Sequence, residues 1–225
     1  MLRIAHRGAS GYEPENTLRS FSKALELGVD MIEFDVRICK GGDLVVFHDE
    51  SLDRITNGQG HISNLALEDL KKYDVGKGER IPTLSEVLDL IDRRVPVNIE
   101  LKSKGTAEPA AIIIGDYIKS KGWSPELFWV SSFDRKELAR FVKINPGAKL
   151  GILARKNPFG VITRAKYYKA HFICIPKPYL KRWWVKTAQK NGFRVFVFTL
   201  NSTEEIEQAR LAGVDGIFSN YPDRI

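Results

Sequence analysis

The stretch that decides the fold is Met31-Ile32-Glu33-Phe34-Asp35-Val36, an apolar run that carries two carboxylates. Alternate side chains of a β-strand share a face, so Glu33 and Asp35 point the same way. Two carboxylates at this spacing raise each other's pKa or bind a cation, and hard oxygen ligands suit Mg²⁺ or Ca²⁺. The run therefore predicts a metal site at a strand end. A half-buried strand with its polar face in water is the alternative for this motif taken alone.

Two further predicted strands carry polar residues in the same way. The segment Leu2–His6 ends in a histidine, and Val97–Lys102 places Asn98, Glu100 and Lys102 on one face. Buried strands of a parallel sheet normally read as continuous Val, Ile and Leu. Ionisable groups near the ends of such strands need partners, which a metal ion or a phosphate would supply.

Strands alternate with helical patterns along the whole chain. The predicted strands cover residues 2–6, 31–37, 96–101, 127–131, 149–153, 172–175, 194–198 and 215–218. The predicted helices cover residues 17–27, 84–91, 109–121, 135–142, 158–166, 179–190 and 203–211. Eight strands in this alternation predict an α/β fold, a TIM (β/α)8 barrel.

A short insertion follows the second strand. Gly41-Gly42 separates that strand from the apolar run Leu44–His48, which predicts a hairpin with an extra strand. Residues 49–82 are then rich in Asp, Asn and Gly. They leave a barrel strand at its C-terminal end, where the working loops of such barrels lie, so we expect them at the rim of an open active site.

Length and composition favour one intracellular domain. The 225 residues suit a single barrel domain over residues 1–225, and no linker or apolar run long enough for a membrane span divides them. The first residues enter a strand directly, without a leader pattern, which predicts a cytoplasmic location. Cys39 and Cys174 are too few for a disulfide framework.

The charge is distributed unevenly. The chain carries +7 overall, yet residues 138–203 contain fourteen Lys or Arg and no Asp or Glu. Aromatic residues are interleaved with this basic region, so peripheral contact of residues 140–194 with an anionic lipid surface and steering of an anionic substrate are two hypotheses. Nucleic-acid binding is not expected, because no nucleic-acid motif accompanies the charge. A solvated face of barrel helices is the structural alternative.

Seven short motifs follow the order of one enzyme family: His6-Arg7-Gly8-Ala9, Pro14-Glu15-Asn16-Thr17, Glu33-x-Asp35-Val36, His48-Asp49, Leu52-Asp53-Arg54 with Thr56-Asn57-Gly58, Glu100-x-Lys102 and Tyr221-Pro222-Asp223. Together they resemble the glycerophosphodiester phosphodiesterase family over essentially the whole chain. Two places depart from the pattern. Phe198 stands where the family commonly has Trp, and Ser219-Asn220 replaces the more usual Thr-Asp. Because both lie away from the expected metal ligands, we expect them to affect substrate fit more than chemistry.

The resemblance implies metal-dependent hydrolysis of glycerophosphodiesters to glycerol 3-phosphate and an alcohol. Glu33, Asp35 and Glu100 would hold the divalent cation, with Mg²⁺, Ca²⁺ and Mn²⁺ as the options. His6 and His48 would be the acid–base pair. The attacking group would be the substrate's own glycerol hydroxyl, which gives a cyclic phosphate that water then opens. The sequence leaves open which histidine is the first base.

Four more residues are predicted to contact or orient the substrate. Arg7 offers a fork for phosphate oxygens and Lys102 a point charge, while Glu15 would orient Arg7 or a histidine. Thr199, beyond the seventh barrel strand, either touches the substrate or begins the next helix, and Asn201 has the same two options. Asn16 is expected to cap a helix.

The other two histidines have structural interpretations. His171, beside an apolar strand, is predicted to be a core residue, and His61 in a polar loop is predicted to lie at the surface.

Two rival functions remain open at this stage. One is a lysophospholipase D or a phosphatidylinositol-type phospholipase on the same fold, which would need an apolar entrance. The other is a barrel that binds phosphate or lipid without catalysis, although all three expected ligands and both histidines are present. The head-group alcohol, the preferred metal and the oligomeric state are also open.

Overall fold

The computed structural model describes residues 1–145, 147–155 and 160–225, and they form the predicted barrel. Its strands are parallel and pair in the order β1, β9, β8, β7, β6, β5, β4, β2, and the pairing of β1 with β2 closes the ring. The bounds are β1 (Leu2–His6), β2 (Met31–Ile38), β4 (Val97–Leu101), β5 (Phe128–Ser132), β6 (Lys149–Leu153), β7 (Phe172–Pro176), β8 (Arg194–Phe198) and β9 (Gly216–Ser219).

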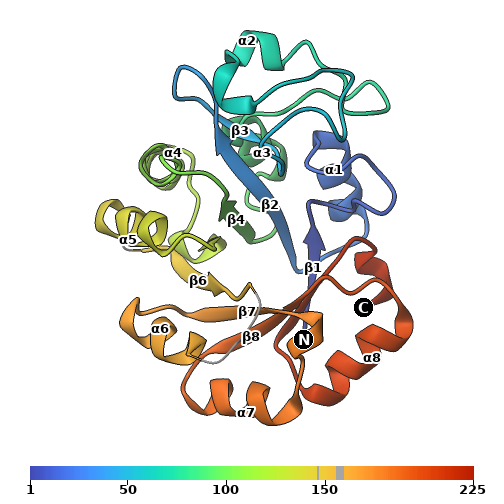
Figure 1. Ribbon diagram of the computed structural model, residues 1–225, viewed down its shortest axis with the longest axis vertical. Coiled ribbons are helices and arrows are strands. Elements are labelled where there is room, and N and C mark those ends of the chain that lie inside the picture. The colour runs from blue at the N-terminus through green and yellow to red at the C-terminus, as the bar shows by residue number, and fades with distance from the viewer. Residues whose placement is uncertain (146, 156–159) are drawn as a thin grey trace.

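Helices surround the strands, as Figure 1 shows. They are α1 (Leu18–Glu26), α3 (Leu84–Ile91), α4 (Ala107–Ser120), α5 (Arg135–Ile144), α6 (Val161–Tyr167), α7 (Arg182–Lys190) and α8 (Thr203–Ala212). Thr17, Thr83 and Ser202 begin α1, α3 and α8 with reciprocal capping boxes. Such caps satisfy backbone N–H groups that the first turn leaves unpaired.

Most helix boundaries lie within two residues of the predicted ones, and the starts of two helices differ for a clear physical reason. The helix predicted over residues 109–121 begins at Ala107, because a proline is tolerated in the first turn, where its missing N–H costs nothing. The helix predicted from residue 179 begins only at Arg182, since Lys177–Tyr179 forms a separate 3₁₀ turn around a proline. Residues 158 and 159 of the helix predicted over 158–166 lie outside the described residues.

The insertion forms a small packed unit beside β2. Strand β3 (Leu44–Val46) pairs antiparallel with β2, as predicted, and is followed by a 3₁₀ turn (Ile62–Asn64) and α2 (Leu67–Leu70). Its own apolar cluster consists of Cys39, Val45, Phe47, Leu52, Ile62, Leu70, Val75 and Ile81. The backbone N–H of Phe47 donates to Asp35 O at 2.9 Å. The unit therefore holds the following residue, His48, next to the end of β2.

The inside of the barrel is apolar below the site. Its side chains are Ile4, Met31, Trp129, Leu153, Phe172, Cys174, Phe196 and Phe218. Gly151 makes room for this layer, because a Cβ there would lie 2.1 Å from the Phe172 ring. A second, larger cluster fills the space between strands and helices. Cys39 and Cys174 are both free and buried.

His171 is exposed, so its prediction as a core residue is wrong. It directly precedes β7 at the N-terminal face of the barrel, and its Nδ1 accepts a hydrogen bond from the Leu150 N–H at 3.2 Å. His61 is exposed, as predicted. No helix in the described part of the chain is long and apolar enough to cross a membrane.

Candidate active site

Three carboxylates meet where β2 and β4 end. Asp35 and Glu100 are direct partners in the parallel pairing, and Glu33 lies two residues before Asp35 on the same face of β2. One oxygen from each of the three lies within 4.8 Å of the others. Glu33 is 2% and Asp35 1% exposed. The alternation that predicted a shared face in the sequence thus produces a buried cluster of three acids.

Burial and neighbouring charges shift the pKa values of the three carboxyl groups in different directions. Burial raises the pKa of Glu33, and the negative charges of Asp35 and Glu100 raise it further. Burial and the charge of Asp35 also raise the pKa of Glu100. Asp35 behaves differently: burial would raise its pKa, but the positive charges of Lys102 and Arg7 outweigh this effect and lower it to about 2.

The donor set fits a divalent cation. The three carboxylates, two buried and one partly buried, outnumber their two cationic neighbours, and all their donor atoms are hard oxygens. Beside them, the buried Asn98 Oδ1 and Ser131 Oγ have no hydrogen-bond partner in the described structure. Such atoms are normally satisfied by water or by an ion's hydration shell. Bound there, Mg²⁺ or Ca²⁺ would be held by Glu33, Asp35 and Glu100.

His6 and His48 reach the same pocket from different elements. His6 ends β1, and its Nδ1 lies 2.7 Å from Asn220 Oδ1. His48 follows β3, and its Nδ1 lies 2.6 Å from Asp49 Oδ1. Burial lowers the pKa of His6 to about 4, with a further contribution from Arg7. Burial also lowers the pKa of His48, against the charge of Asp35.

A chain of ion pairs fixes Arg7 above the carboxylates. Its Nε lies 3.3 Å from Asp35 Oδ2, and its Nη1 lies 2.8 Å from Glu15 Oε1. Arg54, from the insertion, pairs with the same Glu15 at 2.6 Å and also with Asp49. Glu15 thus contacts Arg7, one of the two options predicted for it, the other being a histidine. Arg54 therefore connects the insertion to Asp49, the partner of His48, and through Glu15 to Arg7, the candidate phosphate-binding residue.

Asn16 does not cap the helix, contrary to the prediction. Thr17 is the N-cap residue, and its side chain accepts from the Ser20 N–H. Asn16 instead donates from Nδ2 to Asp35 Oδ2 at 3.0 Å, and its Oδ1 accepts from the Asp35 N–H at 3.3 Å. Its φ of 59° lies in the left-handed region, which asparagine tolerates better than most residues. The loop geometry turns this side chain toward a carboxylate of the cluster.

The pocket that contains these groups has a volume of about 210 Å³ and is lined by His6, Arg7, Glu33, His48, Asn98, Glu100, Lys102, Ser131, Phe133, Leu153, Phe198, Thr199 and Phe218. One wall is ionic and the other is apolar. Lys102 joins them, since its Nζ lies 2.9 Å from Glu100 Oε1 and 5.8 Å from the centre of the Phe133 ring. The pocket can therefore receive a charged phosphate on one side and carbon-rich groups on the other.

Thr199 and Asn201 have different positions. Thr199 lines the pocket, whereas Asn201 accepts a hydrogen bond from the Asn220 N–H at 2.9 Å. Neither residue begins the next helix, because Ser202 is the N-cap of α8.

Sequence reasoning missed several residues of the site. The sequence pattern placed Asn98 on a polar strand face without a role and indicated no role for Ser131 or Phe133. Ser131 lies on β5 and Phe133 just beyond its end. They are two positions apart, like Glu33 and Asp35, and this spacing is the signal that could have identified them. Asn220 stands out in the sequence only as part of the Ser219-Asn220 departure, and nothing local links it to His6, from which it is separated by 214 positions.

The barrel and its pocket define an enzyme whose functional groups gather at the C-terminal ends of the strands, where barrel enzymes carry their active sites. The profile of the Glycerophosphoryl diester phosphodiesterase family matches residues 6–224. The chain belongs to this family of phosphoric diester hydrolases.

Individual relatives and solved structures support the same family. A glycerophosphodiester phosphodiesterase from Caldanaerobacter subterraneus subsp. tengcongensis is 39% identical over 243 residues, which cover all of this chain and 96% of that protein. A solved Oleispira antarctica phosphodiesterase in complex with the product sn-glycerol-3-phosphate superposes with a TM-score of 0.91 at 31% identity, covering 99% of this chain and 94% of that one. A human lysophospholipase D is 39% identical over 112 residues, which cover 44% of this chain and 35% of the human protein.

Proposed function

We propose that this protein hydrolyses glycerophosphodiesters to glycerol 3-phosphate and an alcohol in a divalent-metal-dependent reaction. The observation that carries the proposal is the joining of Glu33, Asp35 and Glu100 with His6 and His48 around one pocket. This pocket combines an anionic cation site with two groups able to move protons at neutral pH. The product in the related Oleispira antarctica structure has the chemistry of the smaller product proposed here.

The chain's own residues have separate roles in the proposed reaction. Arg7 and Lys102 bind and orient the phosphate oxygens, Glu15 holds Arg7 in place, and Thr199 contacts the substrate from the opposite loop. The cation, when bound, supplies positive charge that offsets the phosphate charge as it builds up. One histidine removes a proton from the attacking oxygen and the other protonates the leaving alcohol.

The attacking oxygen is proposed to be the substrate's own hydroxyl. Among the described residues, Ser131 is the one hydroxyl besides Thr199 that lines the pocket, and no imidazole hydrogen-bonds either side chain. A hydroxyl beside the phosphate-bearing carbon reacts intramolecularly, an advantage worth up to about 7–11 kcal/mol in well-oriented cases. The first product is then a cyclic 1,2-phosphate that water opens.

The test compares glycerophosphocholine with its 2-deoxy analogue after removal and re-addition of Mg²⁺, Ca²⁺ or Mn²⁺. We expect no turnover without metal, turnover of glycerophosphocholine alone after re-addition, and a cyclic phosphate in the phosphorus NMR spectrum. Equal turnover of both substrates without a cyclic species would reject substrate-assisted attack in favour of direct attack by water. Full activity in the chelated protein would reject metal dependence.

The range of substrates is a second question for the same site. The apolar wall of Phe133, Leu153, Phe198 and Phe218 and the similarity to a lysophospholipase D favour a lysolipid as the alternative substrate. The head-group panel therefore includes glycerophosphoethanolamine, glycerophosphoinositol and a lysophospholipid. Faster turnover of the lysolipid would make lysophospholipase D the principal activity, whereas failure of every diester would leave a barrel that only binds phosphate or lipid. A phosphatidylinositol-type phospholipase would instead act on a diacyl lipid.

We infer that residues 1–225 act as one catalytic domain, with residues 49–82 at the rim of its site. A cytoplasmic location stays a prediction.

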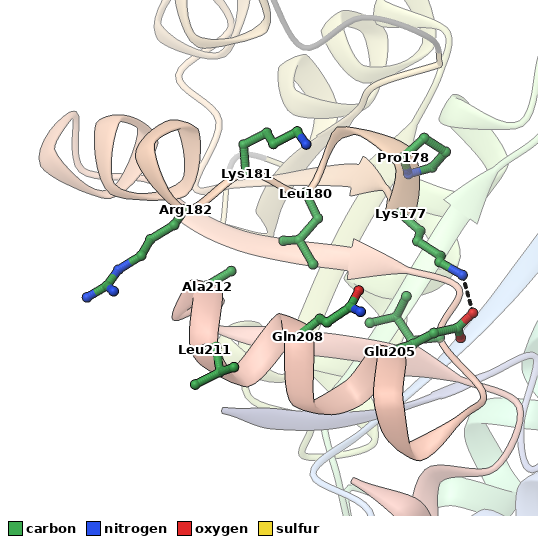
Figure 2. A pocket seen from close by; sticks show the side chains of 10 residues that line it. Lys177, Pro178, Leu180, Lys181, Arg182, Glu205, Gln208, Leu211 and Ala212 are labelled. Atoms are coloured by element: carbon green, nitrogen blue, oxygen red, sulfur yellow. Dashed lines mark hydrogen bonds and ion pairs between the residues drawn. The ribbon is translucent and has the colours of Figure 1, made fainter.

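Contact of the basic region with anionic lipid also stays a prediction. Figure 2 shows the relevant surface, a groove of about 650 Å³ between the start of α7 and α8. Lys181 and Arg182 flank it beside Leu180 and Leu211, and its one acid, Glu205, pairs with Lys177. A groove of this composition offers no acid–base chemistry, so its candidate role is binding. Sedimentation with phosphatidylserine vesicles, compared with phosphatidylcholine vesicles, tests the contact.

A further inference from the structure

The two histidines of the pocket have chemically different partners. His6 Nδ1 lies 2.7 Å from the amide oxygen of Asn220, and His48 Nδ1 lies 2.6 Å from the carboxylate of Asp49. An amide oxygen can only accept a hydrogen bond, so the hydrogen of the neutral His6 ring is on Nδ1 and its Nε2 carries a free lone pair. The Asp49 carboxylate behind His48 raises the pKa of that ring, against the burial that lowers it, because it places a negative charge next to the imidazolium.

The position of Asn220 follows from the closure of the barrel. Strand β9 pairs with β1 so that Ser219 is opposite Ala5, and the next residue of each strand is therefore Asn220 beside His6. The Asn220 N–H donates to Asn201 Oδ1 at 2.9 Å, and the Asn201 N–H donates to Glu205 Oε2 at 2.9 Å. Through these bonds Asn220 is tied to the start of α8. It does not line the pocket, so it can act on the substrate only through His6.

We propose that Asn220 is a positioning residue that holds His6 in the Nδ1-protonated tautomer and so makes it the first base of the reaction. His48, backed by Asp49, is then the first acid. This inference rests on the acid–base function proposed above and assigns the order of proton transfer within it. It also changes the interpretation of the Ser219-Asn220 departure, which was expected to affect substrate fit and instead reaches a histidine of the site.

The proton balance follows from this assignment. His6 Nε2 takes the proton of the substrate hydroxyl while the hydroxyl oxygen bonds to phosphorus. The bond from phosphorus to the alcohol oxygen breaks, and that oxygen leaves with the electron pair and receives a proton from His48. In the second step His48 takes a proton from water as the water oxygen bonds to phosphorus. The bond from phosphorus to the ring oxygen that attacked in the first step breaks, and that oxygen leaves with the electron pair and receives the proton held by His6. Both histidines end in their starting states.

There is a physical reason why an amide, and not a carboxylate, should lie behind His6. The negative charges of Asp35 and Glu15 already raise the pKa of His6, and another carboxylate behind the ring would raise it further. Asn220 orients the ring without adding charge. A partner of this kind typically contributes 10–100-fold to the function of the group that it orients, by analogy with the partners of metal-ligating histidines.

The test uses two substrates, glycerophosphocholine with a poor leaving group and glycerophospho-p-nitrophenol with a good one. We expect His48→Ala to lose activity mainly toward the first, because a good leaving group needs no acid. His6→Ala and Asn220→Ala should be impaired toward both. For Asn220→Ala, kcat should fall about 10–100-fold with little change in KM. Asn220→Asp, whose carboxylate also accepts from Nδ1 but favours the imidazolium, should recover kcat only at a higher pH than the wild type needs. His61→Ala, at the surface, should match the wild type.

Two outcomes of these assays would overturn the assignment. One is p-nitrophenol rescue of Asn220→Ala to the extent seen for His48→Ala, and the other is an unchanged kcat of a folded Asn220→Ala on both substrates. Adding Asn220→Ala to His6→Ala should have no further effect, and an additional loss would show that Asn220 acts elsewhere. If His6→Ala itself keeps full activity on both substrates, the acid–base function fails, whatever Asn220 does.

Nitrogen-15 NMR of the histidine-labelled wild type provides a test that needs no Asn220 variant. In the neutral ring of His6, assigned by loss of its signals in His6→Ala, Nδ1 should have the chemical shift of a protonated nitrogen and Nε2 that of an unprotonated one. The opposite tautomer would reject the proposal.

Discussion

Asp35 is the residue at which the ionic contacts of the pocket converge. It lies 3.3 Å from Arg7 and 3.4 Å from Lys102, and it accepts a hydrogen bond from Asn16. These three contacts stabilise its ionised form, in agreement with its lowered pKa. Glu33 and Glu100 have raised pKa values instead. The negative charge available for a cation therefore depends on these two residues more than on Asp35.

Glu100→Gln should weaken Mg²⁺ binding by more than about tenfold, because affinity in carboxylate sites follows the charge of the ligands. The amide keeps the shape of the side chain, so the fold should remain. Calorimetric titration measures the affinity, and Glu108→Gln on the exposed surface of α4 is the matched control. An unchanged affinity would remove Glu100 from the ligand set.

The stabilisation by Mg²⁺ should increase from about pH 5 to about pH 8, since carboxylates must lose their protons to bind a cation. A carboxyl whose pKa is raised in the folded state binds more protons folded than unfolded above its ordinary pKa. Glu33 and Glu100 therefore lower the stability of the metal-free protein as the pH rises, and the cation offsets this loss. The measurement is the difference in Tm with and without Mg²⁺ at both pH values. An equal difference at the two values would contradict the prediction.

At the scale of elements, the site depends on how β1 turns toward α1. Gly8 makes the turn with a φ of 78°, and Ser20 of α1 packs directly against it. The Ser20 hydroxyl donates to Arg7 O at 3.0 Å. The position of His6 and Arg7 over the carboxylates thus rests on a close approach between a strand end and the first turn of a helix.

Gly8→Ala should lower the free energy of unfolding by more than about 1–3 kcal/mol, the cost of the unfavourable backbone conformation alone. The added Cβ would lie 2.7 Å from the Ser20 backbone, so the helix or the strand end must move and kcat should fall as well. Urea denaturation and initial rates measure the two effects. Gly28→Ala is the control, because its φ of 65° is similar but no atom lies within 4 Å of its Cβ. Equal losses in the two variants would show that the contact with Ser20 is unimportant.

At the scale of the whole molecule, an acidic cluster lies inside a protein with a net charge of +7. Residues 138–203 of the sequence contain fourteen basic residues and no acid. Its potential acts on an anionic diester over a distance of about 10 Å at moderate ionic strength. If the acids bind a metal as proposed, metal binding and attraction of the substrate would use separate parts of the molecule.

The rate constant kcat/KM for an anionic diester should therefore fall about twofold to tenfold as KCl is raised at constant Mg²⁺, through loss of electrostatic steering. Reversing two exposed charges with Lys181→Glu and Arg182→Glu should flatten this dependence while leaving kcat unchanged. A salt-independent kcat/KM in the wild type would show that the basic side has no part in substrate capture.

Much of the architecture could be predicted because it depends on local patterns. The period of two in Glu33 and Asp35 and in Asn98, Glu100 and Lys102 defines strand faces, and all eight predicted barrel strands occur to within one residue at each end. Strand alternation with helices then places the C-terminal strand ends at one face. The pairs that complete the site are not local.

Asn16 with Asp35, Glu15 with Arg54, and His6 with Asn220 are separated by 19, 39 and 214 positions. The sequence by itself determined which strands carry the acids and histidines. Only the tertiary structure decided which neutral or charged group forms a hydrogen bond or ion pair with each of them. The physical reason is that a hydrogen bond requires two groups within about 3 Å. The closure of β1 onto β9 and the packing of the insertion bring these segments together, and no pattern within either segment specifies its partner.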